Sequence, residues 1–436
     1  MRLFPENPHY VEFRGQPALL IGSGEHYGAV LNADFDYLPY LDTLARDGLN
    51  LVRVFSGTYR ELPGEFGIQD NNLAPLPDHF VAPWRKAAGG RYDLTDYNPD
   101  YFSRLRSFIS QAAERGIVVE VSLFCFWYND ALWEASPMHP ANNLQEVGPV
   151  KKEQVYSLQN NDLLPYQEDF ARRMADELKA FDNLYFEMIN EPYSRHDHTS
   201  DLDWQHHIAA IIGDAERHLP AQHLIAINYN NRTQYVHPHP AVSICNFHYA
   251  IPEAVKLNYH LDLLIADDET GFCGQVADPY RREAWLFMLA GGGAFSHLDY
   301  SFTCQHPAGD APIQGSTPGY GGADLRWQLG FMKRFLESAA VWKMQPYNEI
   351  FAWNASVVPA QVMGILHERY VAYFSENQPG RTHLFSLPAG RYQVEWINPV
   401  TGNTFETRTS TNTGGYLRVD LPAHAGDLLM NLIVLS

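Results

Sequence analysis

Residues 184–192 read Leu-Tyr-Phe-Glu-Met-Ile-Asn-Glu-Pro, a short apolar run that ends in two polar side chains and a proline. Apolar and aromatic residues over this length predict a buried strand, and Pro192 stops it because proline cannot donate to a hydrogen-bond ladder. The strand therefore presents Asn190 and Glu191 at its carboxyl end. Buried strands of this kind are typical of parallel sheets, where functional groups gather beyond the carboxyl ends.

A second stretch has the same design. Residues 263–272 read Leu-Leu-Ile-Ala-Asp-Asp-Glu-Thr-Gly-Phe, an apolar strand that ends on the carboxylate of Glu269. Two carboxylates held at the ends of buried strands are what acid-catalysed cleavage of a glycosidic bond requires. Successive side chains of a strand point to opposite faces, so Asp268 replaces Glu269 if the register moves by one residue. The pair predicts an enzyme, and most directly a glycosidase.

Strand-like runs alternate with helical patterns over most of the chain, which predicts an α/β protein with a parallel sheet. Eight strands are expected, the count that closes a (β/α)₈ TIM barrel. They are Ala18–Gly22, Leu49–Phe55, Ile117–Phe124, Leu184–Ile189, Leu224–Asn228, Val242–His248, Leu263–Asp268 and Gly293–Leu298. Helices are expected at Tyr37–Asp47, Pro99–Arg115, Pro165–Ala180, Leu202–His218, Pro279–Ala290 and Leu325–Ala339. Strands five to seven lie so close in sequence that only short helices fit between them.

Three connections are much longer than the others: Gly57–Pro99, Trp127–Leu164 and Tyr300–Ala323. Each follows a strand, so in a barrel all three rise from the carboxyl face, where active sites are built. They are rich in aromatic residues. These rings either line a sugar pocket, where they stack on the sugar, or belong to variable surface loops without a role in binding.

After Gln345 the pattern changes to short alternating runs separated by turn clusters such as Pro388-Ala389-Gly390. This predicts a small antiparallel β-sandwich. We therefore expect a catalytic barrel at residues 1–344 and a sandwich at residues 345–436. The sandwich is expected to be a structural domain docked on the barrel. A carbohydrate-binding module is the alternative, because its aromatic residues suit either role.

A retaining glycosidase places an acid/base carboxyl and a nucleophilic carboxylate about 5 to 5.5 Å apart. We assign Glu191 as the acid/base, with a pKa raised by the nearby charge of Glu269, and Glu269 as the nucleophile. Asn190 is expected to contact the sugar 2-hydroxyl, through a hydrogen bond that strengthens in the transition state. Arg53, inside the buried run Leu-Val-Arg-Val-Phe, needs a carboxylate partner.

These features give the chain a family resemblance. Asn190-Glu191-Pro192 after an apolar strand, Glu269 at the end of a later strand, and Arg53 in the second strand resemble the clan of (β/α)₈ retaining glycosidases typified by glycoside hydrolase family 5. The resemblance covers about residues 10–340 and is to poorly characterised bacterial branches of the clan. It implies that Glu191 is the acid/base, Glu269 the nucleophile, Asn190 the 2-hydroxyl contact and Arg53 the cation that keeps the nucleophile ionised.

The chain departs from the pattern of this clan at two strand ends. Where the clan often has His-x-Tyr, residues 246–249 read Asn-Phe-His-Tyr, so either His248 or Tyr249 is expected to hydrogen-bond the nucleophile. Where many members carry a tryptophan under the sugar, residues 296–300 read Ser-His-Leu-Asp-Tyr. Trp127 or Tyr300 is expected to replace that platform, and His297 is a further candidate for a sugar contact.

The first strand ends in Gly-Ser-Gly-Glu-His-Tyr at residues 22–27. Glu25 and His26 are expected either to bind hydroxyl groups of the terminal sugar or to cap a turn. The histidine pairs His196/His198, His206/His207 and His237/His239 lack His-Glu-x-x-His spacing, so we predict no metal site. No phosphate-binding or acyl-transfer motif is present, and no cofactor is expected.

The net charge of −20 disfavours partners with anionic surfaces, so we expect neither nucleic acid nor membranes as partners. The amino-terminal sequence has no apolar signal segment, and we expect a cytoplasmic protein. The four cysteines show no CxxC spacing and are expected to be buried free thiols.

The sequence thus predicts a retaining exo-acting β-glycosidase for short oligosaccharides or glycosides. The exo mode is expected because long loops can close one end of the cleft. An endo-acting β-glycanase and a catalytically silent carbohydrate-binding protein on the same fold are the alternatives. The expected partner is a small carbohydrate, and self-association into a homo-oligomer is left open.

Overall fold

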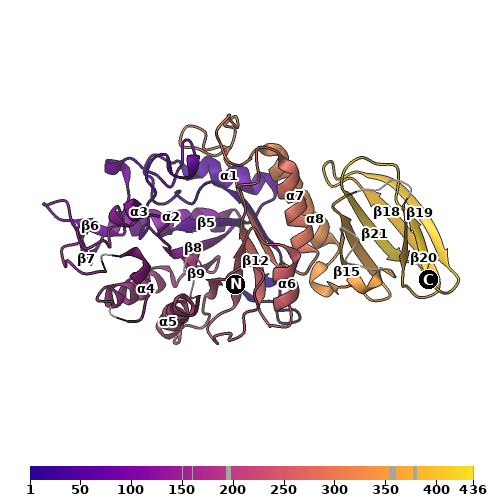
Figure 1. Cartoon of the computed structure of the whole chain (residues 1–436), viewed down its shortest axis with the longest axis horizontal. Coiled ribbons are helices and arrows are strands. Elements are labelled where there is room, and N and C mark those ends of the chain that lie inside the picture. Colours follow the sequence, from indigo (N-terminus) through magenta and orange to yellow (C-terminus); the bar gives the residue numbers. More distant parts are fainter. Residues whose placement is uncertain (150, 160, 193–197, 353–359, 377–380, 436) are drawn as a thin grey trace.

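The barrel closes as predicted. In the computed structural model, which describes residues 1–149, 151–159, 161–192, 198–352, 360–376 and 381–435, eight parallel strands form one closed sheet (Figure 1). In order around the barrel they are β4 (Leu20–Gly24), β5 (Leu51–Phe55), β8 (Val118–Cys125), β9 (Leu184–Asn190), β10 (Leu224–Asn228), β11 (Ile244–His248), β12 (Leu264–Glu269) and β13 (Ala294–Leu298). Each matches a predicted strand, so the predicted (β/α)₈ fold is confirmed.

Helices surround the barrel, and local sequence signals set their ends. They are α1 (Tyr37–Asp47), α2 (Pro99–Glu114), α4 (Leu164–Leu178), α5 (His198–Glu216), α6 (Pro252–Asn258), α7 (Ala277–Met288) and α8 (Ala323–Ser338). The Asn98 side chain accepts a hydrogen bond from the Asp100 N–H and Pro99 occupies the first turn of α2. Residues 229–243, between β10 and β11, form only turns. Within the described ranges, no helix is long and apolar enough to cross a membrane.

A small antiparallel sheet that the sequence did not predict covers the amino-terminal end of the barrel. It consists of β1 (Arg2–Leu3), β2 (Val11–Phe13) and β3 (Gln16–Ala18). Val11 and Phe13 pack in one cluster with barrel residues such as Leu20 and Tyr185. This apolar packing closes the amino-terminal end of the barrel, so the polar side chains of the interior are reached from the carboxyl end.

The three long connections leave the carboxyl ends of barrel strands, as predicted. The connection after β5 contains η1 (Glu65–Gly67), η2 (Pro77–His79) and the hairpin of β6 (Trp84–Lys86) and β7 (Tyr92–Tyr97). The connection after β8 contains α3 (Asp130–Glu134) and η3 (Lys152–Gln154). Their tryptophans Trp84, Trp127 and Trp133 are buried. Much of the aromatic content of these loops therefore serves to pack them together.

The carboxyl-terminal residues form antiparallel sheets, as predicted. The larger sheet contains, in spatial order, β14 (Gln345–Pro346), β15 (Ala360–Ile365), β16 (Arg369–Phe374), β21 (Leu428–Val434), β18 (Gly390–Ile397) and β19 (Thr404–Asn412). The smaller sheet pairs β17 (Thr382–Phe385) with β20 (Leu417–Asp420). Their apolar side chains form a second core that includes the fully buried Trp396.

The cysteines are free thiols, but not all of them are buried. Cys125 and Cys245 are buried in barrel strands, whereas Cys304 is half-buried and Cys273 is exposed. The expectation of burial is wrong for Cys273 because β12 ends at Glu269, which leaves Cys273 in the loop beyond the strand.

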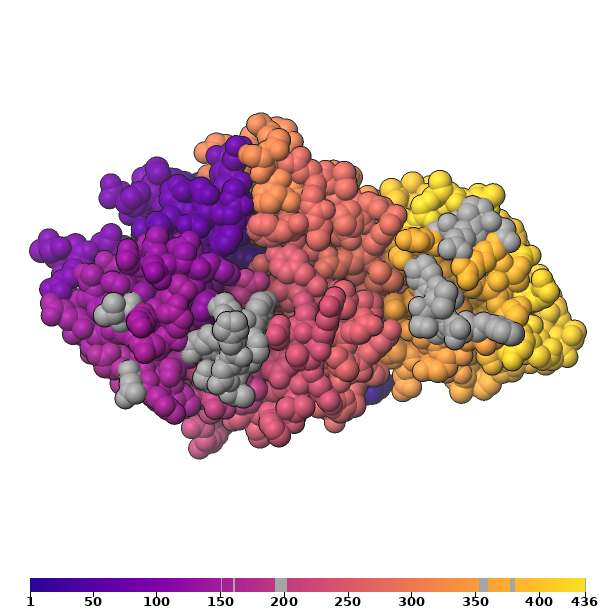
Figure 2. All heavy atoms as spheres, viewed as in Figure 1, coloured from indigo at the N-terminus to yellow at the C-terminus, as the bar shows by residue number. Residues whose placement is uncertain are grey.

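The carboxyl-terminal unit packs on one flank of the barrel, beside α7 and α8, and forms the yellow end of the space-filling view (Figure 2). The Arg281 guanidinium of α7 donates two hydrogen bonds of 2.9 Å to the Asp427 carboxylate, and both side chains are buried. Trp285 stacks on Tyr373 with ring centroids 5.6 Å apart. A buried ion pair and shared apolar packing support a docked structural domain.

We expect Asp427→Ala to destabilise the folded chain by about 3 to 5 kcal/mol, because it removes the buried partner of the Arg281 charge and leaves only the partly exposed Asp278 carboxylate to pair with it. The free energy of unfolding in urea measures the effect. The control is Arg282→Ala on the same helix, whose ion pair with Asp278 is partly exposed and contributes about 1 kcal/mol or less. Equal effects of the two substitutions would contradict a tightly docked interface.

Candidate active site

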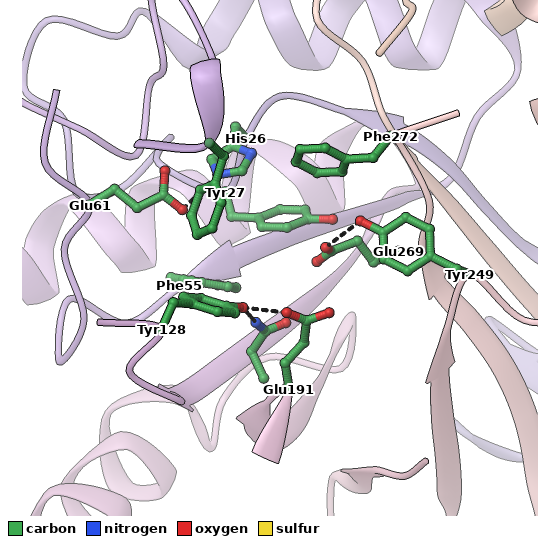
Figure 3. A pocket seen from close by; sticks show the side chains of 11 residues that line it. His26, Tyr27, Phe55, Glu61, Tyr128, Glu191, Tyr249, Glu269 and Phe272 are labelled. Carbon is green, nitrogen blue, oxygen red and sulfur yellow. Dashed lines mark hydrogen bonds and ion pairs between the residues drawn. The ribbon is translucent and has the colours of Figure 1, made fainter. Parts of the chain in front are cut away.

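A pocket of about 390 Å³ opens at the carboxyl end of the barrel (Figure 3). Asn190 and Glu191 line it from the end of β9, and Glu269 lines it from the end of β12. The remaining lining residues come from β5 and the strand-end loops: His26, Tyr27, Phe55, Glu61, Phe66, Tyr128, Tyr249 and Phe272. The two candidate carboxylates therefore share one cavity.

Arg53, in the middle of β5, is fully buried beneath this pocket. Its Nη1 donates to Glu269 Oε2 at 2.9 Å, and its Nη2 donates to Asn190 Oδ1 at 2.8 Å. Nη2 also donates to Glu187 Oε2. A buried guanidinium requires such partners, and in return it fixes the direction of the Glu269 carboxylate.

A β-bulge in β12 brings both Asp268 and Glu269 toward the barrel interior. The pairing of β11 with β12 slips by one residue at Asp268. Asp268 Oδ2 lies 3.5 Å from Arg53 Nε, below the pocket, while Glu269 lines the pocket itself. The predicted placement of these residues on opposite faces is wrong, because the extra residue of a bulge breaks the two-residue period. Glu269 is the carboxylate that a ligand meets.

Two carboxylates that the sequence analysis passed over, Glu120 and Glu187, lie deeper in the barrel and are fully buried. Glu120 accepts a hydrogen bond of 2.7 Å from Asn246 Nδ2, which also donates to Asp268 at 2.8 Å. A signal for both was available, since each is a charged residue inside an apolar strand, as Arg53 is. Together they form the acidic layer that surrounds the guanidinium.

Glu191 is held by two donors at the level of the pocket. The Tyr128 hydroxyl donates to Oε2, and His248 Nδ1 lies 2.9 Å from Oε1. One oxygen of Glu191 and one of Glu269 lie within 4.8 Å of each other and of a His248 nitrogen. This separation fits the spacing of about 5 Å between the two carboxyl groups of retaining glycosidases rather than the wider spacing of inverting ones.

The alternatives at residues 248 and 249 are resolved by geometry. The Tyr249 hydroxyl donates to Glu269 Oε1 at 3.1 Å. His248 Nδ1 is 3.8 Å from Glu269 but 2.9 Å from Glu191. Tyr249 therefore orients Glu269, whereas His248 mainly orients Glu191.

The pKa directions of the carboxyl pair differ from the prediction. Burial alone would raise the pKa of Glu191, but the hydrogen bond and charge of His248, together with the Tyr128 hydroxyl, bring it below its ordinary value. Burial raises the pKa of Glu269, with the Glu191 charge acting in the same direction and His248 opposing it. The predicted raised pKa of Glu191 is thus wrong for the ligand-free site, because the prediction took no account of His248.

The pKa of His248 is shifted by the acidic groups around it. Burial lowers the pKa of this imidazole, but the charges of Glu269 and Asp268 and the hydrogen bonds to Asp268 and Glu191 raise it well above its ordinary value. The ring is fully buried, with Nε2 2.7 Å from Asn228 Nδ2 and 3.2 Å from Asp268 Oδ1. His248 thus links the acidic layer to Glu191.

Of the two candidate residues just after the first barrel strand, His26 lines the pocket and Glu25 does not. His26 lines the pocket, with Nε2 2.8 Å from Glu61 Oε1. Glu25 is fully buried and does not line it. Its two oxygens accept hydrogen bonds from the N–H groups of Gly28 and Ala29 at 2.9 and 3.0 Å, and burial raises its pKa to about 7. The prediction that Glu25 contacts the sugar is wrong, and the alternative prediction that it caps a turn is confirmed.

Three further candidates do not line the pocket. Trp127 is buried, with its ring centroid 5.0 Å from that of Trp133, so it is not a sugar platform. His297 is buried with Nδ1 3.1 Å from the Ser23 hydroxyl, and burial lowers its pKa to about 4. Tyr300 does not line the pocket either, and its ring centroid lies 6.2 Å from that of Phe272. Trp127 packs within a long loop, whereas His297 belongs to β13 and packs against Tyr280 of α7, with ring centroids 4.5 Å apart.

Tyr128 is one of the aromatic residues of the long connections for which a pocket-wall role was expected, and it lines the pocket. Phe272, Glu61 and Phe66 were missed. Phe272 lies three residues beyond β12, so its nearness to a strand end was a usable signal, whereas Glu61 and Phe66 come from a long loop without a local pattern. Backbone strain is a further mark of the site. Tyr27, Glu191 and Tyr249 have φ angles of 52°, 51° and 50°, a left-handed conformation that residues other than glycine rarely adopt.

Among the residues that the structure describes, two groups of side chains have the spacing of metal ligands: Glu187, His248 and Asp268, and Glu191, His248 and Glu269. Both contain His248, whose pKa lies well above its ordinary value, and Arg53 already contacts the carboxylates of the first group. A metal ion would have to displace two cations, so the donor set fits a proton-transfer site better than a metal site. The side chains of the pair His196/His198 lie outside the described residues.

No family model matches the chain, and no curated protein sequence matches it. Solved structures match it in fold. A candidate glycoside hydrolase from Bacteroides vulgatus ATCC 8482 matches with a TM-score of 0.66 and 14% identity, over 100% of this chain and 82% of that chain. A glycoside hydrolase family 5 structure from the same organism has a TM-score of 0.61 and 12% identity, over 99% and 93% of the two chains. An endo-1,4-β-mannanase from Rhizomucor miehei has a TM-score of 0.52 and 13% identity, over 76% and 98%.

At these identities the comparisons establish the fold. The first two matches span nearly all of this chain, so they include the carboxyl-terminal unit as well as the barrel. The predicted resemblance to glycoside hydrolases of the family 5 type is therefore confirmed at the level of architecture.

We expect Arg53→Met to destabilise the chain in a pH-dependent way. The substitution leaves buried carboxylates without their cation, and burial already raises the pKa values of Glu120 and Glu187. A folded state with raised carboxyl pKa values binds protons that the unfolded chain has released, so stability falls as pH rises above about 4. The loss should reach about 3 to 5 kcal/mol near pH 8 and be smaller near pH 5.

Urea unfolding at the two pH values measures this difference. The control is Arg46→Met, which removes an exposed cation paired with Asp47 and should change stability little at either pH. A loss for Arg53→Met that is independent of pH would contradict the electrostatic role.

Proposed function

We propose that the protein is a retaining, exo-acting β-glycosidase for short oligosaccharides or glycosides. The observation that carries the proposal is the pair of carboxylates, Glu191 and Glu269, with oxygens within 4.8 Å of each other in one pocket. The fold shared with solved glycoside hydrolases supports the reaction class.

In the first step a Glu269 oxygen forms a bond to the anomeric carbon while the bond from that carbon to the glycosidic oxygen breaks. Arg53 and Tyr249 donate to the two oxygens of Glu269 and support its anionic form for attack. Glu191 reacts in its protonated form and gives its proton to the departing oxygen. His248 Nδ1, 2.9 Å from Glu191 Oε1, stabilises the carboxylate that this transfer leaves.

In the second step Glu191 removes a proton from water, which attacks the anomeric carbon and releases Glu269. Neutralisation of Glu269 in the covalent intermediate removes one negative charge from beside Glu191. This lowers the pKa of Glu191 and keeps it in the ionised form that accepts the proton. Asn190 donates to the Tyr128 hydroxyl and accepts from Arg53, so its amide is fixed at the pocket base, where a sugar 2-hydroxyl is expected.

The alternatives make different products. An endo-acting glycanase releases oligosaccharides from a polymer, whereas an exo-acting enzyme releases one sugar at a time. The exo mode is supported by the loops after β4, β5 and β12, which contribute His26, Glu61 and Phe272 to the pocket walls. A silent sugar-binding protein would bind saccharides without turnover.

Hydrolysis of aryl β-glycosides tests the assignment of the carboxylates. With glucoside, mannoside, galactoside, xyloside, fucoside and glucuronide substrates, Glu269→Ala should abolish turnover, and Glu191→Ala should lower it by about 10² to 10⁴. Azide should yield an α-glycosyl azide with Glu269→Ala and a β-glycosyl azide with Glu191→Ala. Glu25→Gln, which changes a buried carboxyl outside the pocket, is the matched control. Full activity in both alanine variants, or an inverted product anomer, would overturn the proposal.

We expect His248→Gln to move both limbs of the pH profile of kcat/KM to higher pH. The positive charge of His248 lowers the pKa values of Glu191 and Glu269, so its removal lets both carboxyl groups hold their protons to higher pH. Tyr128→Phe is the comparison, since it removes a hydrogen bond to Glu191 without changing charge. A profile that keeps its position in His248→Gln would exclude this electrostatic coupling.

A further inference from the structure

The direction in which a substrate lies follows from the barrel order and the proposed role of Glu191. An acid/base residue faces the leaving group, so the leaving group lies toward β9. In the closed order of eight strands, β13 is opposite β9, and β4 is next to β13. His26, just beyond β4, is therefore on the side of the non-reducing sugar. In Figure 3 His26 and Glu61 lie across the pocket from Glu191.

On that side a chain of hydrogen-bonded side chains closes the pocket. His26 Nε2 lies 2.8 Å from Glu61 Oε1, and Asn71 Nδ2 donates to Glu61 Oε2. Asn71 is in turn fixed by the Leu73 N–H, which donates to its Oδ1 at 2.8 Å. Glu61 is 3% exposed. A buried carboxylate with both oxygens bound holds His26 and Asn71 together across two loops.

Space for further sugar lies behind this chain. An outer cavity of about 440 Å³ is lined by Ile68, Asp70 and Asn71 among others. The same three residues also line a gap of only about 10 Å³, and His26 lines both this gap and the active-site pocket. The gap therefore adjoins the active-site pocket at His26 and the outer cavity at Asn71.

We propose that His26, Glu61 and Asn71 form an end wall that restricts the non-reducing side of the active site to one sugar residue, with His26 as the contact that recognises that residue. The assignment rests on the proposed glycosidase function. It names the residues that make the action exo rather than endo.

The charges and hydrogen bonds of the end wall also limit which class of terminal sugar can bind. Burial lowers the pKa of His26, but the Glu61 charge and hydrogen bond raise it above its ordinary value. Because Glu61 accepts the Nε2 proton, Nδ1, which is buried and has no hydrogen-bond partner among the described residues, is the ring nitrogen left for a sugar hydroxyl. Glu61, Glu191 and Glu269 surround the same pocket and repel a second anion. The terminal residue is thus a neutral sugar bound through a hydroxyl group, not a uronic acid.

The test uses a 4-nitrophenyl β-disaccharide of the sugar that the full-length enzyme hydrolyses best as a monoside. The wild type should release the terminal monosaccharide first and leave the 4-nitrophenyl monoside. His26→Ala/Asn71→Ala should join the two cavities and release intact disaccharide directly. His26→Ala alone should lower kcat/KM for the monoside about ten- to a hundredfold, as expected for a lost hydrogen bond from a charged donor. Asp78→Ala, exposed on the same loop, is the control and should match the wild type.

Calorimetric binding of the free trisaccharide gives a second readout that does not depend on turnover. The ratio of trisaccharide affinity to monosaccharide affinity should be at least about tenfold higher in the double variant than in the wild type, since more sugar fits beyond the wall. Wild-type release of intact disaccharide, or an unchanged product pattern and affinity in a folded double variant, would overturn the wall while leaving the glycosidase intact. Absence of wild-type hydrolysis on every monoside would instead overturn the proposed function, and the wall with it.

Discussion

The interior of this barrel depends on the guanidinium of Arg53. Four carboxylates, from Glu120, Glu187, Asp268 and Glu269, lie within 4 Å of its nitrogen atoms in the barrel interior. None of them is stable there as an isolated anion, because the cost of removing a charge from water exceeds what a single neutral hydrogen bond returns. The cation on β5 lets acidic side chains from β8, β9 and β12 coexist, and it orients the one that reaches the pocket.

The barrel supplies the second constraint, which is position. Parallel strands deliver their carboxyl-end residues to one mouth, so Glu191 and Glu269 meet although they are distant in sequence. The bulge in β12 turns the consecutive residues Asp268 and Glu269 both toward the barrel interior, with Asp268 in the buried acidic layer and Glu269 in the pocket above it. The amino-terminal sheet closes the other end, and the carboxyl-terminal unit buttresses α7 and α8 from outside.

His248 connects these levels chemically. It contacts Asp268 in the buried layer and Glu191 in the pocket, and its positive charge makes the two pocket carboxyls unequal. The site therefore consists of a charge network rather than of two independent acids. On the other side, the buried Glu61 organises His26 and Asn71 in the same way, with one carboxylate fixing two neutral or cationic partners. In both the His248 and the Glu61 networks, burial strengthens a few hydrogen bonds, and these bonds fix the orientation of the side chains.

The sequence by itself determined the barrel, the antiparallel carboxyl-terminal unit and the two strand-end carboxylates, because strand periodicity and strand-end position are local properties that a short stretch carries. It also marked Arg53, since a charge inside an apolar strand must find a partner. Only the tertiary structure decided which loop side chains face the cavity. Trp127 and His297 turned into packed layers, Glu25 became a turn cap, and Glu61, Phe66 and Phe272 entered the pocket instead. Loop direction depends on packing between segments far apart in the chain, and so do the His248 contacts that reverse the expected pKa of Glu191. No local pattern encodes either of them.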